Sequence, residues 1–193
     1  MGYYGFPVRE TVAEKRARNA RALQNFKKLN PQVTIKQIQV KGNRIGTSFW
    51  GKAWCDNLSH YADYGNRICR GKSYLKEGAV FDLNIQKGTV TGLVAGSNIT
   101  PYHVTITIRP LTNNRLVKKI DGNIESLEEL AEGKFPIEFG HIFLTRNHGL
   151  FPTSKEITFK CTCPDSAKMC KHISACFYAI GLNLMKNHSS YLS

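Results

Sequence analysis

The sequence predicts an α+β fold in which an antiparallel sheet of about four strands packs with helices. Short β-rich runs separated by turn residues follow one another between residues 79 and 108, and apolar residues recur at helical spacing on both sides of them. Strands joined by short turns pair antiparallel, because parallel strands need long crossover connections. With 193 residues, of which 41% are hydrophobic, the chain can bury an ordinary domain core.

The first element is a basic helix at residues 11–29. Thr11 and Glu14 form a T-x-x-E capping box at its start, and Asn30-Pro31 ends it. We expect this helix to dock loosely and to order fully only on a partner, because its apolar stripe is thin. The stripe consists mostly of alanine: Ala13, Ala17, Ala20, Leu23 and Phe26.

Between the basic helix and the sheet we expect a strand, a helix and a loop. Residues 33–40 alternate between polar and apolar side chains, with a phase slip at Lys36-Gln37, which predicts a strand. Residues 49–62 carry a broad apolar face and predict a helix, whereas the polar, glycine-rich stretch that follows, up to Gly78, predicts a surface loop. This helix and the sheet should share one core, made of Trp50, Trp54, Leu58, Leu83, Ile85 and Leu93.

The sheet begins with a hairpin in which residues 79–85 and 89–95 flank the turn Gln86-Lys87-Gly88. A further strand is expected at 102–108, and Pro110 ends it. A last strand at 156–160 leads into a cysteine cluster, and a final helix is marked by Ile173, Phe177, Ile180 and Leu184. Helical segments are expected near 113–121, 126–132 and 136–144.

Four metal-binding side chains lie close together in the sequence, Cys161, Cys163, Cys170 and His172, in the spacing C-x-C-x6-C-x-H. Three thiolates and one neutral imidazole make a closed tetrahedral site of the kind that holds structural zinc. Cys161 and Cys163 should leave the same face of a strand end. Cys170 and His172 need a non-helical or first-turn conformation, because helical positions two apart point away from each other. The spacing predicts one structural Zn²⁺ with no open position for catalysis.

The remaining cysteines and histidines have no partner at ligand spacing. Cys176 lies beside the apolar stripe of the final helix, so we expect it in the core. Cys55 and Cys69 each lack a paired donor. The histidines expected at the surface or at the edge of the core are His60, His103, His141, His148 and His188.

Together with the cysteine cluster, several longer segments make the chain resemble bacterial SWIM zinc finger family proteins. They are SFWGKAWCDNL (48–58), RGKSYLKEGAVFDLNI (70–85), GLFPTSKEITFKCTCPD (149–165) and MCKHISA (169–175). The resemblance implies a zinc-stabilised ββα element with DNA-binding and protein-binding roles, in proteins that often accompany Swi/Snf-type helicase-like ATPases. Relatives usually continue beyond the last helix, so a function carried by their tail is expected to be absent here.

The sequence divides into a basic helical arm (1–30), an α+β domain (31–148), a SWIM-type zinc finger module (149–187) and a tail (188–193). Lys and Arg number 27 against 14 Asp and Glu, and residues 1–72 hold 14 of the basic and 4 of the acidic ones. This localised positive charge predicts contact with nucleic acid, although anionic lipid or an acidic protein would also be attracted. The candidate contacts are Arg16, Arg18, Arg21, Lys27, Lys28, Arg67, Arg70, Lys72, Lys168 and Lys171.

Enzyme signals are weak. Gly71-Lys72-Ser73 matches the end of a phosphate-binding loop, but the glycine that this loop requires is replaced by Asn66. Cys55 and His60 would lie about 140° apart on a helix, which disfavours a catalytic pair with Asp63 as orienter. We therefore expect a protein that is not an enzyme and has no small-molecule substrate.

Two functions from different classes remain. The first is a zinc-containing module that binds nucleic acid, DNA above all, or acts as an adaptor for a helicase-like ATPase, with Tyr64 and Tyr74 available to stack on bases. The alternative is a protein–protein interaction scaffold without direct nucleic-acid contact. No stretch approaches the ~18 apolar residues of a membrane span, and the charged residues 1–30 lack the apolar run of a signal peptide. We therefore expect a cytoplasmic protein without membrane contact.

Overall fold

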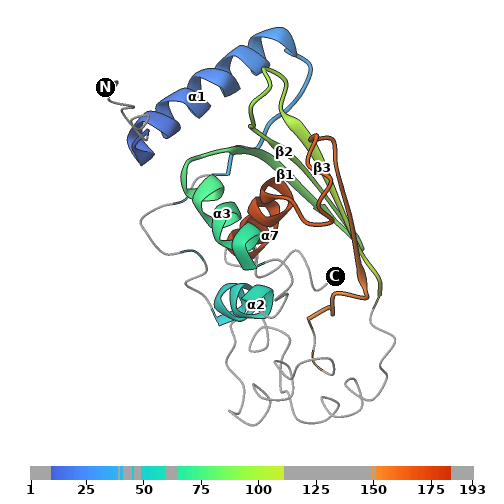
Figure 1. Cartoon of the computed structure of the whole chain (residues 1–193). Helices are drawn as coiled ribbons and strands as arrows, with labels where there is room; N and C mark the ends of the chain where they lie inside the picture. The colour runs from blue at the N-terminus through green and yellow to red at the C-terminus, as the bar shows by residue number, and fades with distance from the viewer. Residues whose placement is uncertain are drawn as a thin grey trace, which may run out of the picture.

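Four helices and a four-stranded antiparallel sheet make up the described part of the chain (Figure 1), which confirms the predicted fold class. The structure is a computed structural model that describes residues 10–38, 40, 45, 49–59, 65–110, 149 and 151–183. The helices predicted near 113–121, 126–132 and 136–144, and the tail at 188–193, lie outside these residues. None of the described helices is long and apolar enough to cross a membrane.

The sheet is a meander in which each strand pairs with the next. Its strands are β1 (Val80–Gln86), β2 (Thr89–Val94), β3 (Tyr102–Ile108) and β4 (Ile157–Cys161), in the order β1-β2-β3-β4. The predicted hairpin is confirmed: β1 and β2 are joined by Lys87-Gly88, and Gly88 has a φ of +71°, which suits glycine in a tight turn. The predicted strands at 102–108 and 156–160 are confirmed as β3 and, one residue later, β4.

Helices α2 (Phe49–Ser59), α3 (Gly65–Lys76) and α7 (Lys171–Asn183) lie on one side of the sheet, and α1 (Val12–Leu29) lies beyond the end of α3 (Figure 1). α7 is the central element, because it contacts all four strands as well as α2 and α3. Every residue of α7 from His172 to Leu182 is buried. A helix surrounded in this way has to be apolar on all faces, which explains its sequence.

Of the six residues in the predicted core of α2 and the sheet, three are buried and three are half-buried at its edge. Trp54, Leu58 and Leu83 are buried in a single cluster, and Ile85 and Leu93 pack against it. The indole N–H of Trp54 donates to the carbonyl of Phe177 over 2.7 Å, so the one polar atom of this side chain is satisfied in the core. Trp50 is half-buried, with its ring 6.4 Å from that of Phe151.

The strand predicted at 33–40 is not formed by the described residues 33–38. They make no ladder with the sheet, and the backbone N–H of Lys36 instead donates to the carboxylate of Asp82 over 2.9 Å. Asp82 follows an irregularity in the register of β1, which interrupts the edge that a further strand would need. The alternating pattern reflects contact with the core, because Ile38 is buried and Ile35 packs against the same cluster.

The loop predicted before Gly78 is wrong over residues 65–76, which form α3. Ile68, Gly71 and Leu75 are buried at helical spacing, and Gly71 lies where α7 crosses: a Cβ there would be 2.3 Å from the Cβ of Ser174. The glycine that suggested a loop is therefore required by packing. The helix ends in a Schellman motif, with Gly78 at a φ of +70° and Ala79 N–H donating to Tyr74 O over 3.0 Å.

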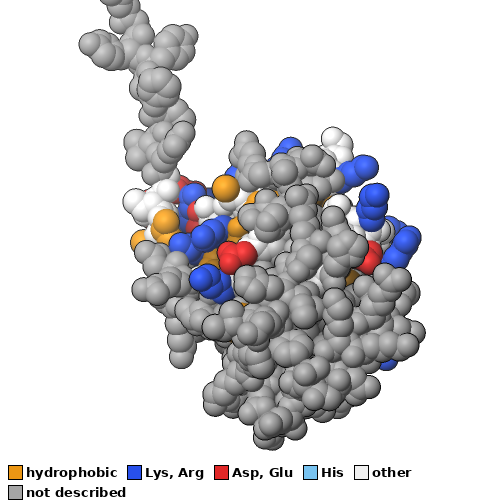
Figure 2. Space-filling model, turned by 90° about the horizontal axis from the view of Figure 1, so that it is seen from below, with side chains coloured by type: hydrophobic (Ala, Val, Ile, Leu, Met, Phe, Trp, Pro, Cys, Tyr) orange, Lys and Arg blue, Asp and Glu red, His pale blue; other side chains and the backbone are white. Residues whose placement is uncertain are grey.

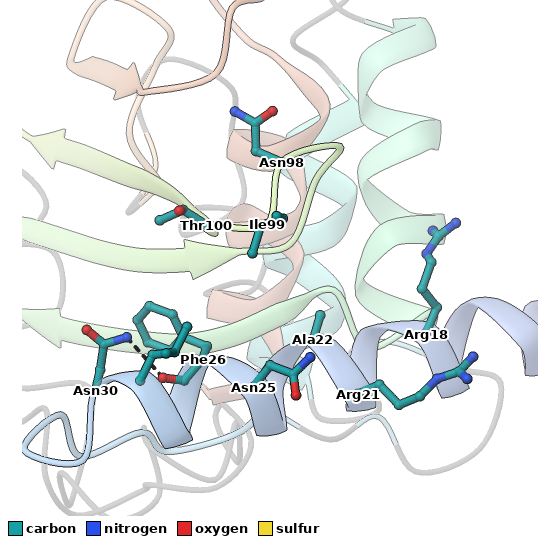
Figure 3. A pocket seen from close by; sticks show the side chains of 10 residues that line it. Arg18, Arg21, Ala22, Asn25, Phe26, Asn30, Asn98, Ile99 and Thr100 are labelled. Atoms are coloured by element: carbon teal, nitrogen blue, oxygen red, sulfur yellow. Dashed lines mark hydrogen bonds between the residues drawn. The ribbon is translucent and has the colours of Figure 1, made fainter.

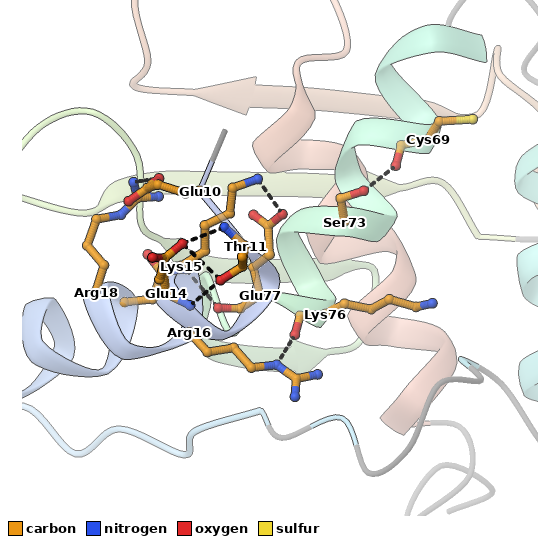
Figure 4. A network of polar contacts seen from close by, with 11 residues as sticks. Glu10, Thr11, Glu14, Lys15, Arg16, Arg18, Cys69, Ser73, Lys76 and Glu77 are labelled. Atoms are coloured by element: carbon orange, nitrogen blue, oxygen red, sulfur yellow. Dashed lines mark hydrogen bonds and ion pairs between the residues drawn. The ribbon is translucent and has the colours of Figure 1, made fainter. Parts of the chain in front are cut away.

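The capping box predicted for α1 is confirmed by two hydrogen bonds (Figure 4). Glu14 N–H donates to the Thr11 hydroxyl over 3.2 Å, and Thr11 N–H donates to the Glu14 carboxylate over 2.7 Å. The predicted contact face is wrong for Ala13, Ala17 and Ala20, which are exposed, but its other members, Leu23 and Phe26, are buried and half-buried. The buried side chains of α1 are Asn19 and Leu23.

Polar contacts hold α1 against the C-terminal end of α3 (Figure 4). Arg16 Nε donates to the carbonyl of Lys76 over 2.8 Å, and Asn19 donates to the carbonyl of Glu77 over 2.8 Å. Lys15 Nζ lies 2.9 Å from the buried carboxylate of Glu77. These donors satisfy carbonyl groups that the end of a helix leaves free, so α1 docks without a wide apolar stripe.

Gly71→Ala is expected to lower the free energy of unfolding by about 1–3 kcal/mol, because the new methyl group would collide with Ser174. The sign is diagnostic, since Gly→Ala inside an unobstructed helix stabilises by about 0.5–1 kcal/mol. Ser73→Ala, on the exposed side of the same helix, should stay within about 0.5 kcal/mol of the unchanged protein. Urea denaturation measures both, and a stabilised Gly71→Ala variant would contradict the close crossing.

Candidate metal centre

The four predicted donors come together where β4 ends and α7 begins. Cys161 is the last residue of β4, Cys163 follows it, Cys170 precedes α7, and His172 lies in the first turn of α7. Their donor atoms all lie within 4.8 Å of one another, and His172 Nδ1 is 3.7 Å from Cys170 Sγ and 3.9 Å from Cys161 Sγ. This cluster could hold one metal ion.

Local hydrogen bonds position the segment between Cys161 and Cys170. At the end of β4, Thr162 N–H donates to His103 O over 3.1 Å, and His103 N–H donates to the Thr162 hydroxyl over 3.0 Å. Asp165 then turns the chain by accepting the N–H of Ala167 over 3.1 Å. An ion pair between Asp165 and Arg67 joins this turn to α3. Both sides of the donor cluster are therefore held by the fold itself.

The distances suit a tetrahedral zinc site. With Zn–S about 2.3 Å and Zn–N about 2.0 Å, neighbouring sulfur and nitrogen ligands of a tetrahedron are about 3.5 Å apart. The distances of 3.7 and 3.9 Å between His172 Nδ1 and the two sulfurs are only slightly longer. The donor set fits the ion as well, because thiolate and imidazole are the ligands of structural zinc.

The other ring nitrogen of His172 points away from the sulfurs. Nε2 is buried without a hydrogen-bond partner among the described residues. The ring of Tyr102 lies 4.7 Å from the His172 ring and that of Tyr74 lies 5.5 Å from it. Gly96 completes this enclosure, since a Cβ there would be 2.0 Å from Tyr102 and 3.2 Å from Nε2. Two aromatic rings therefore fix the orientation of the imidazole. In most metal-bound histidines a hydrogen bond from the second ring nitrogen has this role.

The three thiols of the cluster differ in acidity. A hydrogen bond to Cys170, together with burial, raises the pKa of Cys161, and burial raises the pKa of Cys163. The hydrogen bond from Cys161, with further help from His172 and the N–H of Ile173, lowers the pKa of Cys170 to about 4. At neutral pH the cluster therefore has one thiolate and two thiols.

The cysteines outside the cluster behave as expected from their burial. Cys176 is fully buried in α7, and desolvation raises the pKa of its thiol. Burial raises the pKa of Cys55 to about 11. Cys69 is exposed on α3, away from a second donor in the described residues. His60 and Asp63 lie outside the described residues, as do His141, His148 and His188.

The structure separates the predicted nucleic-acid contacts into two groups. The first group lies on α3 and consists of Arg67, Arg70 and Lys72. α3 is next to the segment that carries Lys168 and Lys171, because Arg67 pairs with Asp165 and the Tyr74 ring centre is 5.1 Å from Lys171 Nζ. The other five lie along α1: Arg16, Arg18, Arg21, Lys27 and Lys28. On the face drawn in Figure 2 the described cations likewise lie in separate groups with carboxylates beside them.

Three of these cations already have partners within the fold. Arg16 is bound to the carbonyl of Lys76, Arg18 to the carboxylate of Glu10, and Arg67 to that of Asp165. Arg70, Lys72 and Lys168 are exposed, and Lys72 lies on the flank of α3 that faces Cys55 of α2. The sequence did not indicate the contributions of Gly96 and Tyr102 to the metal centre, because they approach His172 only in the folded chain. Tyr64 lies outside the described residues.

No family model and no solved structure matches the chain. It is 35% identical over 150 residues to a protein of Mycobacterium tuberculosis named "Uncharacterized protein Rv2102". The match covers 76% of this chain and 53% of that protein, so the chain spans about half the length of this relative. The name of the relative gives no activity, so the likeness leaves the function to be argued from the site.

Cys170→Ala and His172→Ala are each expected to lose the metal, because a site with three remaining ligands is open to water and far weaker. Cys176→Ala removes a thiol of the same helix outside the cluster and should keep one metal ion per chain. Elemental analysis of the purified proteins measures this directly. Full metal content in either ligand variant would show that these four residues are not the ligands.

Zinc affinity is expected to rise with pH, by about two logarithmic units per pH unit around neutrality. The raised pKa values of Cys161 and Cys163 mean that two protons must leave when the metal binds, whereas Cys170 is already a thiolate. Competition with a colorimetric chelator at several pH values measures the slope. An affinity independent of pH would contradict the assigned protonation states.

Proposed function

We propose that this protein is a zinc-binding module of the SWIM type that binds nucleic acid, DNA above all, or serves as an adaptor for a helicase-like ATPase. The observation that carries the proposal is the donor cluster: three sulfurs and one imidazole nitrogen within 4.8 Å of one another. Magnesium and calcium prefer oxygen ligands, so this set disfavours both ions, and three thiolates with one imidazole are typical of structural zinc. The site would be structural, because four protein ligands leave no position for a substrate.

The surroundings of the cluster support the SWIM assignment. β3 and β4 pair antiparallel, and α7 starts next to the end of β4, so two strands and one helix surround the donors. The order C-x-C before the helix and C-x-H at its start agrees with the arrangement that the sequence resemblance implies. The N-terminal end of α7 also favours an anionic thiolate cluster, because the helix dipole is positive there.

Free positive charge on α3 and on the segment between Cys163 and Cys170 supports nucleic acid as the partner. Arg70, Lys72 and Lys168 are exposed and have no ion pair among the described residues. Side chains of this kind contact phosphates and position a protein on a nucleic acid without reading its sequence. A protein partner, such as the helicase-like ATPase, would then join a protein already held on DNA.

Replacing Arg70, Lys72 and Lys168 together by glutamine should weaken binding to a random DNA duplex at least tenfold. The slope of log affinity against log salt should fall by about 0.9 for each phosphate that the variant no longer neutralises. Fluorescence anisotropy of the zinc-loaded protein at several salt concentrations measures both quantities. The matched control is the same removal of charge at Lys87, Arg109 and Lys155, which lie exposed at the opposite end of the sheet from Cys161.

The control variant should bind DNA like the unchanged protein. Equal weakening by both variants would mean that net charge alone attracts DNA, with no surface devoted to it. Absence of DNA binding by the unchanged protein, even at low salt, would overturn the nucleic-acid function and favour the protein–protein scaffold.

A further inference from the structure

We infer that the groove between α1 and residues 98–100 binds unpaired bases, so that the nucleic acid of this protein is single-stranded or locally opened. The inference rests on the proposed function and specifies its ligand. The groove has a volume of about 490 Å³. Figure 3 shows α1 as one wall and the connection between β2 and β3, with Asn98, Ile99 and Thr100, as the other.

Apolar side chains in this groove are unusually accessible. Ile99 is 91% exposed and Leu29 is 75% exposed, on opposite walls. Phe26 lies half-buried between them and contributes the aromatic ring of the groove. The flat face of an unpaired base can cover such side chains and stack on the ring, whereas the bases of a duplex already cover each other. This combination therefore favours a single strand over a duplex.

Charge in the groove fits a polyanion. Arg18 and Arg21 are among the lining residues, and none of the lining residues is acidic. α1 as a whole carries six Lys and Arg but one Glu, and that residue, Glu14, is engaged in the capping box. Arg18 binds the carboxylate of Glu10, and both side chains are about half exposed. A phosphate could replace this carboxylate at the guanidinium group, since both are anionic acceptors for arginine.

Amide groups provide contacts for base edges. Asn25, Asn30 and Asn98 all line the groove. The side-chain amide nitrogen of Asn30 donates to the carbonyl of Phe26 over 2.9 Å, which leaves the side-chain oxygen to accept. Asn25 and Asn98 have no hydrogen bond to the described residues. An amide offers a donor and an acceptor side by side, which is what the edge of an unpaired base presents. Aromatic, apolar, amide and arginine side chains thus match base, sugar and phosphate in one place.

The test uses the zinc-loaded full chain with a fluorescein-labelled oligothymidylate of about 12 nucleotides and a duplex of equal length. Arg18→Gln with Arg21→Gln should weaken single-strand binding about tenfold or more and lower the salt slope by about 1.4. Ile99→Ser, at a fully accessible position, should weaken it about fivefold with little change of the slope. Glu10→Gln should tighten it, because Arg18 loses its competing carboxylate.

Lys87→Gln with Arg109→Gln removes the same charge far from the groove and should leave single-strand binding unchanged. The inference is overturned if Ile99→Ser and the double arginine variant bind the oligothymidylate like the unchanged protein, or if they weaken duplex binding equally. If the groove variants have no effect while those at Arg70, Lys72 and Lys168 do, the proposed function stands without this groove. If the unchanged protein binds neither probe, both proposals fall.

Discussion

The burial of α7 on every side is the constraint on which the rest of the structure depends. The sheet covers one side of this helix, and α2 and α3 cover the others. Its neighbours approach so closely that glycine is required at the contacts: a Cβ on Gly71 would meet Ser174, and a Cβ on Gly92 would lie 2.7 Å from Cys176 Sγ. Because the helix cannot shift in such packing, its first turn has a fixed place, and Cys170 and His172 face the end of β4.

The metal centre is therefore part of the main core, and its two halves are held by different forces. Backbone pairing with β3 positions Cys161, whereas packing of α7 positions Cys170 and His172. A bound ion would link the end of the sheet to the start of the buried helix. The free energy of metal binding would then stabilise the sheet and α7 together. The boundaries of the separate module predicted at 149–187 stay a prediction.

The described positive charges fall into two groups. Lys15, Arg16 and Arg67 hold α1 and the metal-binding segment against α3 through carboxylates and carbonyl groups. Arg21, Arg70, Lys72 and Lys168, by contrast, are exposed and have no ion pair among the described residues. Net charge alone does not distinguish these groups, so variants that remove Arg16 would disturb the docking of α1 as well as any phosphate contact.

Features that depend on neighbouring residues followed from the sequence alone. They include the capping box at Thr11, the hairpin at Lys87-Gly88, the strands on either side of it and the four donors around Cys161, because the hydrogen bonds or spacing concerned extend over only a few residues. Tertiary contacts decided the rest. Gly71 suggested a loop in the sequence, but it lies in a helix whose contact with Ser174 of α7 leaves no room for a side chain. Residues 33–38 have the polar and apolar pattern of a strand, yet they pack against the core without pairing with the sheet. The docking of α1, the aromatic enclosure of His172 and the groove beside Ile99 join segments far apart in the chain, and their residue types have no local periodicity that could have revealed them.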